Sequence, residues 1–381
     1  MSSNSSRNRP LKIALLGTRG IPANYGGFET FAEQLSTRLV DRGHRVTVYG
    51  RSHFVCPDLH TFRGVDLQVL PAFRSKYLET VTHTSLSVLH ALFCPYDLLL
   101  VCNAANAFLC WIPGLRGQKV VLNVDGIEHM RRKWNRVGKA YYRLGEFLST
   151  IIPDCTVTDA QCVERYYLDE YGFRSKFIPY GASNETVGGS EELKRLGLTR
   201  RRYLLYVSRL EPENNARLVI EAYLCSGVEF PLVVIGNAPY NRHYVRELHR
   251  LAEGKNVLFP GAIYGKGYRE LLAHCLCYVH ATEVGGTHPA LVEAMGAGAL
   301  VLVNDTPENR EVVHDCGFFY PFNQLESLSR LMQEISSRFR EYEDHRKKAQ
   351  LRVQQCYDWE DIVTQYEELF YELTAGSVQI V

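Results

Sequence analysis

The chain has 381 residues, 46% of them hydrophobic and 22% charged, and its 43 basic and 42 acidic residues leave a formal net charge of +1 at pH 7. This length suits two α/β domains, and this composition is typical of a folded globular protein rather than a disordered one. A net charge so close to zero gives no global reason to expect a nucleic-acid-binding protein.

The N-terminal residues and the cysteines indicate a cytoplasmic protein. Residues 1–10 are polar and lack the apolar core of a signal peptide, so we expect a disordered tail. The eleven cysteines are scattered, odd in number and without a Cys-x-x-Cys pair, which favours reduced thiols. The most apolar stretch, residues 96–111, is interrupted by polar residues and is shorter than the roughly 20 residues of a transmembrane helix. No transmembrane helix is predicted.

The first half of the chain alternates strands and helices. A strand at residues 12–16 leads through a glycine-rich loop at 17–27 into a helix whose apolar residues recur every 3.6 positions. Gly43 ends that helix before a strand at 46–49. Further strands are predicted at 97–101, 119–124, 156–158 and 176–179, with a helix at 137–152. This alternation predicts a parallel sheet covered by helices, in a domain spanning residues 11–182.

The second half repeats this pattern after a polar, glycine-containing connection at 182–202. Strands are predicted at 203–207, 232–235, 257–259, 277–280 and 300–303, giving a second domain at 200–357. Long amphipathic stretches follow at 325–355 and 359–373, and we expect the C-terminal segment, 358–381, to pack back on the first domain. Ligands of open α/β sheets bind at the carboxyl ends of the strands, so the active site is expected in a cleft between the domains.

The glycine-rich loop after the first strand is a candidate ligand-binding element. Gly26 and Gly27 begin the following helix, whose backbone N–H groups favour an anion such as a diphosphate. Arg19, Asn24 and Tyr25 of the same loop are candidates for contact with an acceptor substrate. The glycine spacing does not match a dinucleotide-binding motif, and a simple turn between strand and helix is the alternative reading.

A second loop, residues 283–288, is the strongest candidate for binding a nucleotide-diphosphate donor. Gly285, Gly286 and Thr287 precede Pro289, which suits the first turn of a helix, so the unpaired N–H groups at that helix start form a phosphate cradle. Glu293 lies one turn further on, where its carboxylate would accept hydrogen bonds from ribose hydroxyls. A surface glutamate on an amphipathic helix is the alternative.

Two neighbouring residues of this loop are further donor-binding candidates. Glu283 begins the loop, and His288 ends it as a donor to sugar or phosphate, with ordinary packing as its alternative. Neither belongs to a metal-binding motif, because the sequence contains no His-Glu-x-x-His and no carboxylate cluster with ligand spacing.

Charged residues also follow two other predicted strands. Arg209 follows the first strand of the second domain and is a candidate to stabilise a departing diphosphate, with an ordinary surface position as the alternative. Asp125 and Glu128 follow the strand at 119–124 and are candidates to take a proton from an acceptor hydroxyl or to stabilise positive charge at the anomeric carbon.

Several of these segments resemble family 4 retaining glycosyltransferases, which have the GT-B fold of two Rossmann-like, doubly wound domains facing a central cleft. Leu291-Val292-Glu293-Ala294-Met295 is similar to the Leu-x-Glu-Ala-Met helix of that family, and Glu293 matches the second glutamate of its paired motif. The first glutamate falls at Gly285, and Glu283 is a candidate replacement. Arg209 matches the family's arginine, whereas Asn214 stands at the position of its lysine, for which Arg19 or Lys266 would have to substitute.

The opening segment, residues 17–30, together with 123–134 and 212–215, resembles the bacterial rhamnosyltransferase branch of this family. That resemblance implies dTDP-rhamnose as donor, a sugar on a polyprenyl diphosphate as acceptor, a role in surface polysaccharide synthesis, and catalysis without metal or cofactor. Another UDP- or GDP-sugar, an epimerase or phosphorylase on the same scaffold, and a non-catalytic nucleotide-sugar-binding protein are the alternatives.

A basic and aromatic segment follows Glu128. Arg131, Arg132, Lys133, Arg136 and Lys139 are interleaved with Trp134, Tyr141 and Tyr142. Such a segment predicts either peripheral contact with anionic lipid at the inner face of the cell membrane or an ordinary solvated helix face.

Overall fold

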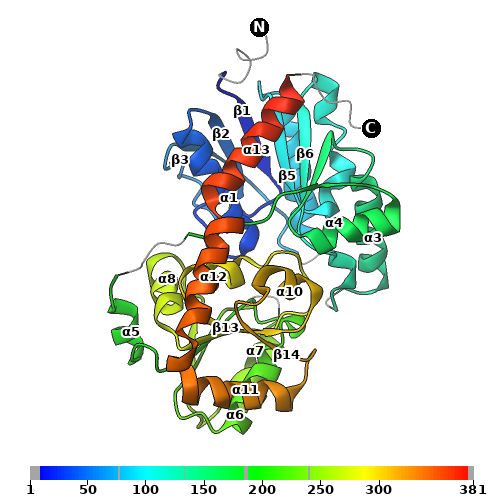
Figure 1. Cartoon of the computed structure of the whole chain (residues 1–381). Coiled ribbons are helices and arrows are strands. Elements are labelled where there is room, and N and C mark those ends of the chain that lie inside the picture. Colours follow the sequence, from blue (N-terminus) through cyan, green and yellow to red (C-terminus); the bar gives the residue numbers. More distant parts are fainter. Residues whose placement is uncertain (1–8, 76–77, 133, 184–187, 239–240, 376–381) are drawn as a thin grey trace. The chain divides into compact units, whose positions relative to one another are not determined.

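The computed structural model describes residues 9–75, 78–132, 134–183, 188–238 and 241–375. The chain divides into two compact units (Figure 1). The first unit combines the residues up to His129, the segment Trp134–Tyr180 and the C-terminal segment from Trp359. The second unit combines Gly181–Asp358 with the short segment Met130–Lys133.

The first unit is built on an eight-stranded sheet. Its strands run in the order β3-β4-β2-β1-β5-β6-β7-β8, and every neighbouring pair is parallel except β3 and β4. The central strands are buried on both faces, as expected for a sheet covered by helices. The strands are β1 (Lys12–Leu16), β2 (Arg45–Arg51), β3 (Thr61–Phe62), β4 (Val65–Leu70), β5 (Leu98–Cys102), β6 (Lys119–Val124), β7 (Cys155–Thr158) and β8 (Lys176–Phe177).

Helices cover both faces of this sheet. On one face, α1 (Gly27–Asp41) and α13 (Trp359–Thr374) share a core with β1, β2 and β5. On the other face, a second core brings in α2 (Glu79–Leu92), η2 (Ala104–Leu109), η3 (Pro113–Arg116), α3 (Arg136–Ser149) and α4 (Gln161–Tyr171). The short helix η4 (Glu128–Met130) follows β6.

The last helix is part of the first unit although it lies at the other end of the sequence. In Figure 1, α13 runs across the sheet beside α1. Tyr366 and Phe370 pack into the core of α1, and the Tyr366 hydroxyl accepts a 2.6 Å hydrogen bond from the buried Asn123 side chain at the end of β6. Asn123 Oδ1 in turn accepts a hydrogen bond from Tyr180.

This buried hydrogen bond gives a testable prediction. Tyr366→Phe removes the acceptor of the Asn123 amide and leaves a buried N–H group unpaired, so we expect the free energy of unfolding to fall by about 1–2 kcal/mol. Urea unfolding measures this loss. Tyr371→Phe, at a half-buried residue of the same helix, is the control and should cost much less. Equal stability of the two variants would contradict the assignment.

The second unit contains a six-stranded, fully parallel sheet in the order β11-β10-β9-β12-β13-β14. Its strands are β9 (Leu204–Val207), β10 (Leu232–Ile235), β11 (Val257–Gly261), β12 (Cys277–His280), β13 (Leu300–Asn304) and β14 (Phe318–Tyr320). Its helices are α5 (Glu191–Leu196), η5 (Pro212–Asn214), α6 (Ala216–Ser226), α7 (Arg242–Leu251), α8 (Gly265–His274), α9 (Pro289–Gly296), α10 (Pro307–Val313), α11 (Leu325–Arg338), η6 (Phe339–Tyr342) and α12 (Glu343–Cys356). The predicted α/β class with two parallel sheets is confirmed.

Several sequence-based element boundaries differ from the structure, and three of them concern helices. The expected connection at 182–202 contains α5, whose Leu193 is buried and donates its N–H to Glu270 on α8. The expected long stretch at 325–355 is divided between α11 and α12, because the chain turns through η6. The helix expected at 137–152 is α3, which ends at Ser149. None of the helices described is both long enough and apolar enough to cross a bilayer.

Candidate functional site

Each sheet has a point at which the order of its strands reverses. In the second unit, the chain leaves β9 toward β10 and β11 on one side, and it continues through β12 and β13 on the other. Loops at the carboxyl ends of two strands that flank such a switch point form the ligand site of doubly wound sheets. The loops after β9 and β12 carry Arg209 and the segment 283–288, so the topology brings these two sequence-predicted elements together.

Backbone contacts fix the loop that carries Arg209. The Arg209 carbonyl accepts a 2.6 Å hydrogen bond from the side chain of Asn214, and Leu210 N–H donates to the Asn237 carbonyl. Gly236, at the end of β10, approaches so closely that a Cβ there would lie 1.9 Å from the Ser208 carbonyl oxygen. The position of Arg209 is therefore determined by the backbone of β9 and β10.

Asn214, at the position where the resemblance implies a lysine, has a structural contact instead. It is buried, its amide donates to the Arg209 carbonyl, and its own carbonyl accepts from the Tyr206 hydroxyl. Lys266, considered as a substitute cation, forms an ion pair with Glu191 at 3.0 Å. Another cation of the second unit is Arg269 on α8, and its charge acts to lower the pKa of the Glu293 carboxyl group. Sequence reasoning missed Arg269, because nothing in its local sequence marks it.

The loop after β12 leads into the N-terminus of α9, with His288 as the N-cap residue and Pro289 in the first turn. The His288 imidazole lies against Gly285, where a Cβ would be 2.2 Å from His288 Cε1. Burial, followed by the charges of His280, Arg131 and Arg209, holds the pKa of His288 well below its usual range. The ring is therefore neutral, and Arg209 is among the charges that act on it.

Glu283 is held in place by side chains from three other segments. Its Oε1 accepts hydrogen bonds from Asn215 Nδ2 at 3.0 Å and from Asn323 Nδ2 at 2.6 Å, and its Oε2 lies 3.1 Å from Arg132 Nη2. Asn215 and Asn323 both have positive φ, at 59° and 55°, a conformation that asparagine tolerates better than most residues. The side chain of Asn304, at the end of β13, donates to Asn323 Oδ1 and accepts from the Asn323 backbone N–H. Local sequence patterns do not indicate this network, in which the hydrogen-bonded residues Asn215 and Asn323 lie 108 residues apart.

Glu293 lies half-buried on α9 and accepts a 2.7 Å hydrogen bond from the Tyr268 hydroxyl on α8. Burial raises the pKa of Glu293 to about 7, although the Tyr268 hydrogen bond and the charge of Arg269 act in the opposite direction. A carboxyl group with this pKa changes its charge near neutral pH. A ligand that prefers the protonated or the ionised carboxyl group therefore shifts its protonation.

In the first unit, the switch point lies between β1 and β5, and the glycine-rich loop follows β1. Side chains of α1 bind this loop: Glu29 accepts from Arg19 N–H at 2.9 Å, and Glu33 accepts from Ala23 N–H at 2.7 Å. Asn24 donates to the Phe54 carbonyl. The carboxylates of Glu29 and Glu33 therefore lie close to the start of α1. Their negative charge disfavours a bound diphosphate at Gly26 and Gly27.

Arg19 belongs to a cluster of charged side chains beside this loop. Its guanidinium stacks on the Tyr25 ring at 3.5 Å and lies 3.5 Å from Glu79, which also contacts Arg51 and His53. Burial alone would raise the pKa of Glu79, but Arg51, Arg19 and His53 outweigh it, so the pKa lies below its usual value. Arg19 is thus held within the first unit.

Asp125 and Glu128 follow β6, as predicted, but they have different surroundings. Asp125 is half-buried, and its charge contributes, after burial, to raising the pKa of Tyr180 and of Cys102 at the end of β5. Glu128 is buried and accepts a 3.1 Å hydrogen bond from Trp134 Nε1. His129, which the sequence did not single out, contacts the buried Glu146 through Nδ1 at 2.8 Å.

The basic and aromatic segment after Glu128 does not form one exposed face. Arg131 and Tyr142 are buried, and Trp134 packs on Tyr142 at a centroid distance of 4.9 Å. Arg132, Arg136 and Lys139 are exposed, while Lys133 lies outside the described residues. Among the described residues, no three His, Cys, Asp or Glu side chains gather as a metal site would require.

Comparison with known proteins finds a family model that matches the second unit. A family model described as "Glycosyl transferases group 1" matches residues 190–352, which include Arg209 and all of α9. This match lies within the second unit and covers most of it. It agrees with the predicted enzyme class, a glycosyltransferase. A second model, described only as a domain of unknown function (DUF1972), matches residues 99–183 of this chain and includes Asp125 and Glu128.

One curated relative is the "O-antigen chain mannosyltransferase B" of Escherichia coli, which is 24% identical over 180 residues. The alignment covers 45% of this chain and 46% of the relative, so the chain spans about half the length of the relative that it matches. This relative is a mannosyltransferase and not a rhamnosyltransferase.

Solved structures show the fold. A sucrose-phosphate synthase from Thermosynechococcus elongatus matches with a TM-score of 0.79 at 19% identity, covering 96% of this chain and 100% of the other. Anabaena Alr3699/HepE, in complex with UDP and glucose, matches with a TM-score of 0.77 at 19% identity, covering 94% and 99%. The GT-B fold that the sequence resemblance implied is confirmed.

Proposed function

We propose that this protein transfers a hexose, with retention of anomeric configuration, from a nucleotide-diphosphate sugar to a saccharide acceptor. The observation that carries the proposal is that Arg209 and the N-terminus of α9 flank the same switch point of the second sheet. A cation and the N-terminus of a helix at one sheet edge suit a diphosphate leaving group. The alternatives of an epimerase or a binding protein have no separate feature of the structure in their favour.

The residue roles follow from this geometry. Arg209 and the backbone of Gly285, Gly286 and Thr287 stabilise the charge that develops on the diphosphate as the bond to the sugar breaks. Glu293 accepts hydrogen bonds from the ribose, and Glu283 with neutral His288 contacts the sugar. Because two asparagines orient Glu283, it is the candidate replacement for the glutamate missing at Gly285.

On the acceptor side, Asp125 remains the catalytic candidate of the first unit. Glu128 is hydrogen-bonded to Trp134, so we assign it to holding the loop after β6 rather than to proton transfer. Arg19, Asn24 and Tyr25 shape the acceptor region, with Arg19 stacked on Tyr25 and Asn24 bound to the Phe54 carbonyl.

For the donor we propose dTDP-rhamnose, and for the acceptor a polyprenyl-diphosphate-linked saccharide in bacterial surface polysaccharide synthesis at the cytoplasmic side of the membrane. The resemblance of residues 17–30, 123–134 and 212–215 supports the rhamnosyl donor. The mannosyltransferase relative supports polysaccharide synthesis but favours another hexose, and the UDP-glucose complex of a structural neighbour adds a third candidate.

A thermal-shift panel of nucleotide sugars tests this proposal, since a ligand that binds only the folded state raises the melting temperature. We expect dTDP-rhamnose to give the largest rise. A larger rise with a GDP- or UDP-sugar would replace the donor and keep the enzyme class. No rise with any nucleotide sugar would contradict the proposed function.

The pKa of Glu293 gives a further prediction. Ribose hydroxyls donate to the ionised carboxylate, so a proton on Glu293 competes with the nucleotide sugar, and affinity should rise with pH. With a pKa of about 7 in the free protein, we expect affinity to increase about tenfold from about pH 6 to about pH 8.

Titration calorimetry measures this effect with an intact nucleotide sugar, whose doubly esterified diphosphate does not titrate in this range. Glu293→Gln retains an acceptor for Tyr268 but cannot ionise, so its affinity should not vary with pH. A variant that keeps the pH dependence of the parent protein would rule out Glu293 as its source.

A further inference from the structure

The face of the first unit formed by α2, η3 and α3 exposes large apolar side chains. On α2, Leu86 and Leu89 point away from the core, and Phe93, which follows the helix, is 77% exposed. Val88 and Ala91 of the same helix are buried in the core beneath. The outer side of α2 is therefore apolar although it faces solvent.

The segment around η3 extends this apolar face. Trp111 is 56% exposed and Leu115 is 67% exposed. Gln118 donates its side-chain N–H groups to the carbonyls of Ala91 and Cys94, which ties the residues after η3 to the end of α2. The exposed side chains of α2 and η3 therefore belong to neighbouring elements.

The helix α3 and the residues after it add a third row of exposed apolar residues. Val137 and Leu144 on α3 and Ile151, two residues after its end, recur at seven-residue spacing and are all exposed. On its inner side, Tyr141 donates to the Ala105 carbonyl of η2 at 2.6 Å. Together, α2, η3 and α3 form what we term the α2–α3 surface.

Exposed cations lie among these apolar side chains. Arg116, Arg136, Lys139 and Arg143 are exposed, and the described Asp and Glu residues from 71 to 153 are buried or half-buried, although the next residue, Asp154, is exposed and pairs with Lys119. Arg143 is paired with Glu170 on the neighbouring α4. Arg116, Arg136 and Lys139 place positive charge among the apolar side chains, and this combination complements an anionic and partly apolar layer.

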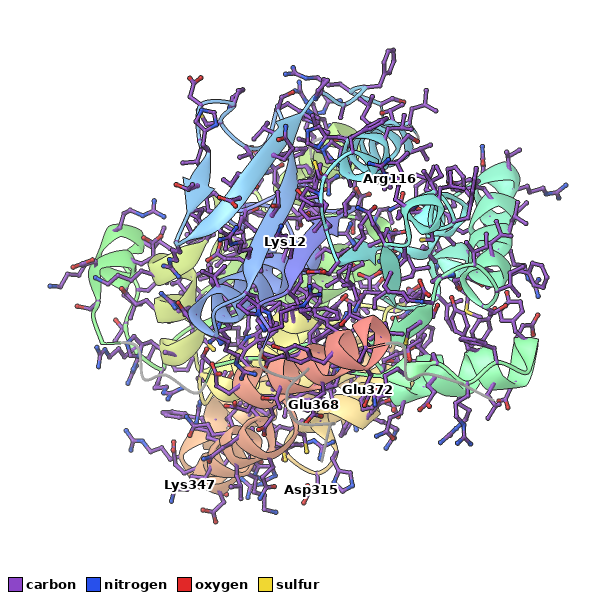
Figure 2. The ribbon with its side chains drawn as sticks, turned by 90° about the horizontal axis from the view of Figure 1, so that it is seen from above. Lys12, Arg116, Asp315, Lys347, Glu368 and Glu372 are labelled. Atoms are coloured by element: carbon purple, nitrogen blue, oxygen red, sulfur yellow. The ribbon has the colours of Figure 1, made fainter. Side chains whose placement is uncertain are left out.

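The opposite face of the same unit has the opposite charge. Helix α13 contains no Arg or Lys and exposes Glu360, Asp361, Glu368 and Glu372. In Figure 2, Arg116 lies on the other side of the strands from Glu368 and Glu372. An anionic surface would therefore attract one face of this unit and repel the other.

We propose that the α2–α3 surface binds the surface of an anionic lipid bilayer, with Phe93, Trp111 and Leu115 entering the interface and Arg116, Arg136 and Lys139 contacting head groups. The described part of the chain has no membrane-spanning helix, so this contact is peripheral. This proposal rests on the proposed function for its lipid-linked acceptor. It deepens that function, because it brings the first unit to the lipid layer that holds the acceptor.

Vesicle co-sedimentation of the full chain tests the proposal. We expect binding to phosphatidylcholine vesicles that contain phosphatidylglycerol, little binding to pure phosphatidylcholine, and weaker binding at high salt. Trp111→Ser with Leu115→Ser should lower binding about tenfold or more, because both apolar contacts with the interface are lost. Arg116→Glu with Lys139→Glu should lower binding to the anionic vesicles about tenfold or more.

Matched controls come from exposed residues of the second unit. Leu351→Ser and Lys347→Glu change similar side chains and should leave vesicle binding unchanged. A parent protein that ignores anionic vesicles, or controls that lose as much binding as the surface variants, would overturn the proposal. Sedimentation equilibrium showing a dimer that only the Trp111 and Leu115 variant dissociates, without any vesicle binding, would assign the surface to a second copy instead.

The nucleotide-sugar panel is run without vesicles, which separates the two proposals. Vesicle binding without any thermal shift would remove the proposed function and keep the lipid-binding surface. A thermal shift without vesicle binding would keep the proposed function and remove the lipid-binding surface.

Discussion

Arg209→Ala should lower the rate of nucleotide release from the donor by about a hundredfold or more, because the guanidinium stabilises negative charge that is largest in the transition state. The loop after β9 holds the Arg209 backbone through Asn214 and Gly236, so the loss should arise from the missing cation rather than from unfolding. Steady-state release of nucleoside diphosphate from the nucleotide sugar measures it.

Two further variants sharpen this result. Arg209→Lys keeps a positive charge but loses the planar, two-pronged donor, so its rate should fall between those of the parent and Arg209→Ala. Arg246→Ala removes an exposed arginine from α7 of the same unit and should leave the rate unchanged. An Arg209→Ala enzyme as fast as the parent would exclude Arg209 from leaving-group stabilisation.

The second large effect is expected at Gly236. A Cβ there would lie 1.9 Å from the Ser208 carbonyl oxygen, and its φ of +151° disfavours any side chain. Gly236→Ala should therefore reduce the free energy of unfolding by about 3 kcal/mol, from backbone overlap and strain together. Since Ser208 precedes Arg209, the displaced loop should also slow donor turnover in the fraction that remains folded.

Gly254→Ala separates strain from overlap. Gly254 also has positive φ, at +69°, but nothing lies within 4 Å of a Cβ placed there. Its replacement should cost only about 1 kcal/mol and leave turnover unchanged. Urea unfolding and the donor-release assay compare the two variants. Similar losses at both positions would show that close packing on Ser208 is not what makes Gly236 necessary.

The elements with strong local patterns could be predicted from the sequence. The buried strands β1, β6 and β10 were predicted with their observed bounds, because short apolar runs between turn residues have few alternatives. Arg209, the loop before Pro289 and Glu293 could be proposed as a site, since strand ends and a helix start are visible locally. The break between α11 and α12 could not be predicted, because no proline or glycine marks η6.

The contacts that orient the candidate site lie far apart in the sequence. Asn323 reaches Glu283 across 40 residues, and Tyr268 reaches Glu293 across 25. The burial of Asn214 goes with its hydrogen bonds to the Arg209 carbonyl and the Tyr206 hydroxyl. Such pairings depend on tertiary packing, which a single sequence does not reveal. The exposed apolar side of α2 was missed for a related reason, since a helix pattern does not show which side is covered.

The structure of the protein crystallised with a nucleotide sugar tests the central claim most directly. We predict that the diphosphate lies within hydrogen-bonding distance of the Arg209 guanidinium and of the backbone N–H groups at the start of α9, with the ribose on Glu293. A diphosphate bound elsewhere, with Arg209 and α9 free of ligand, would contradict the account.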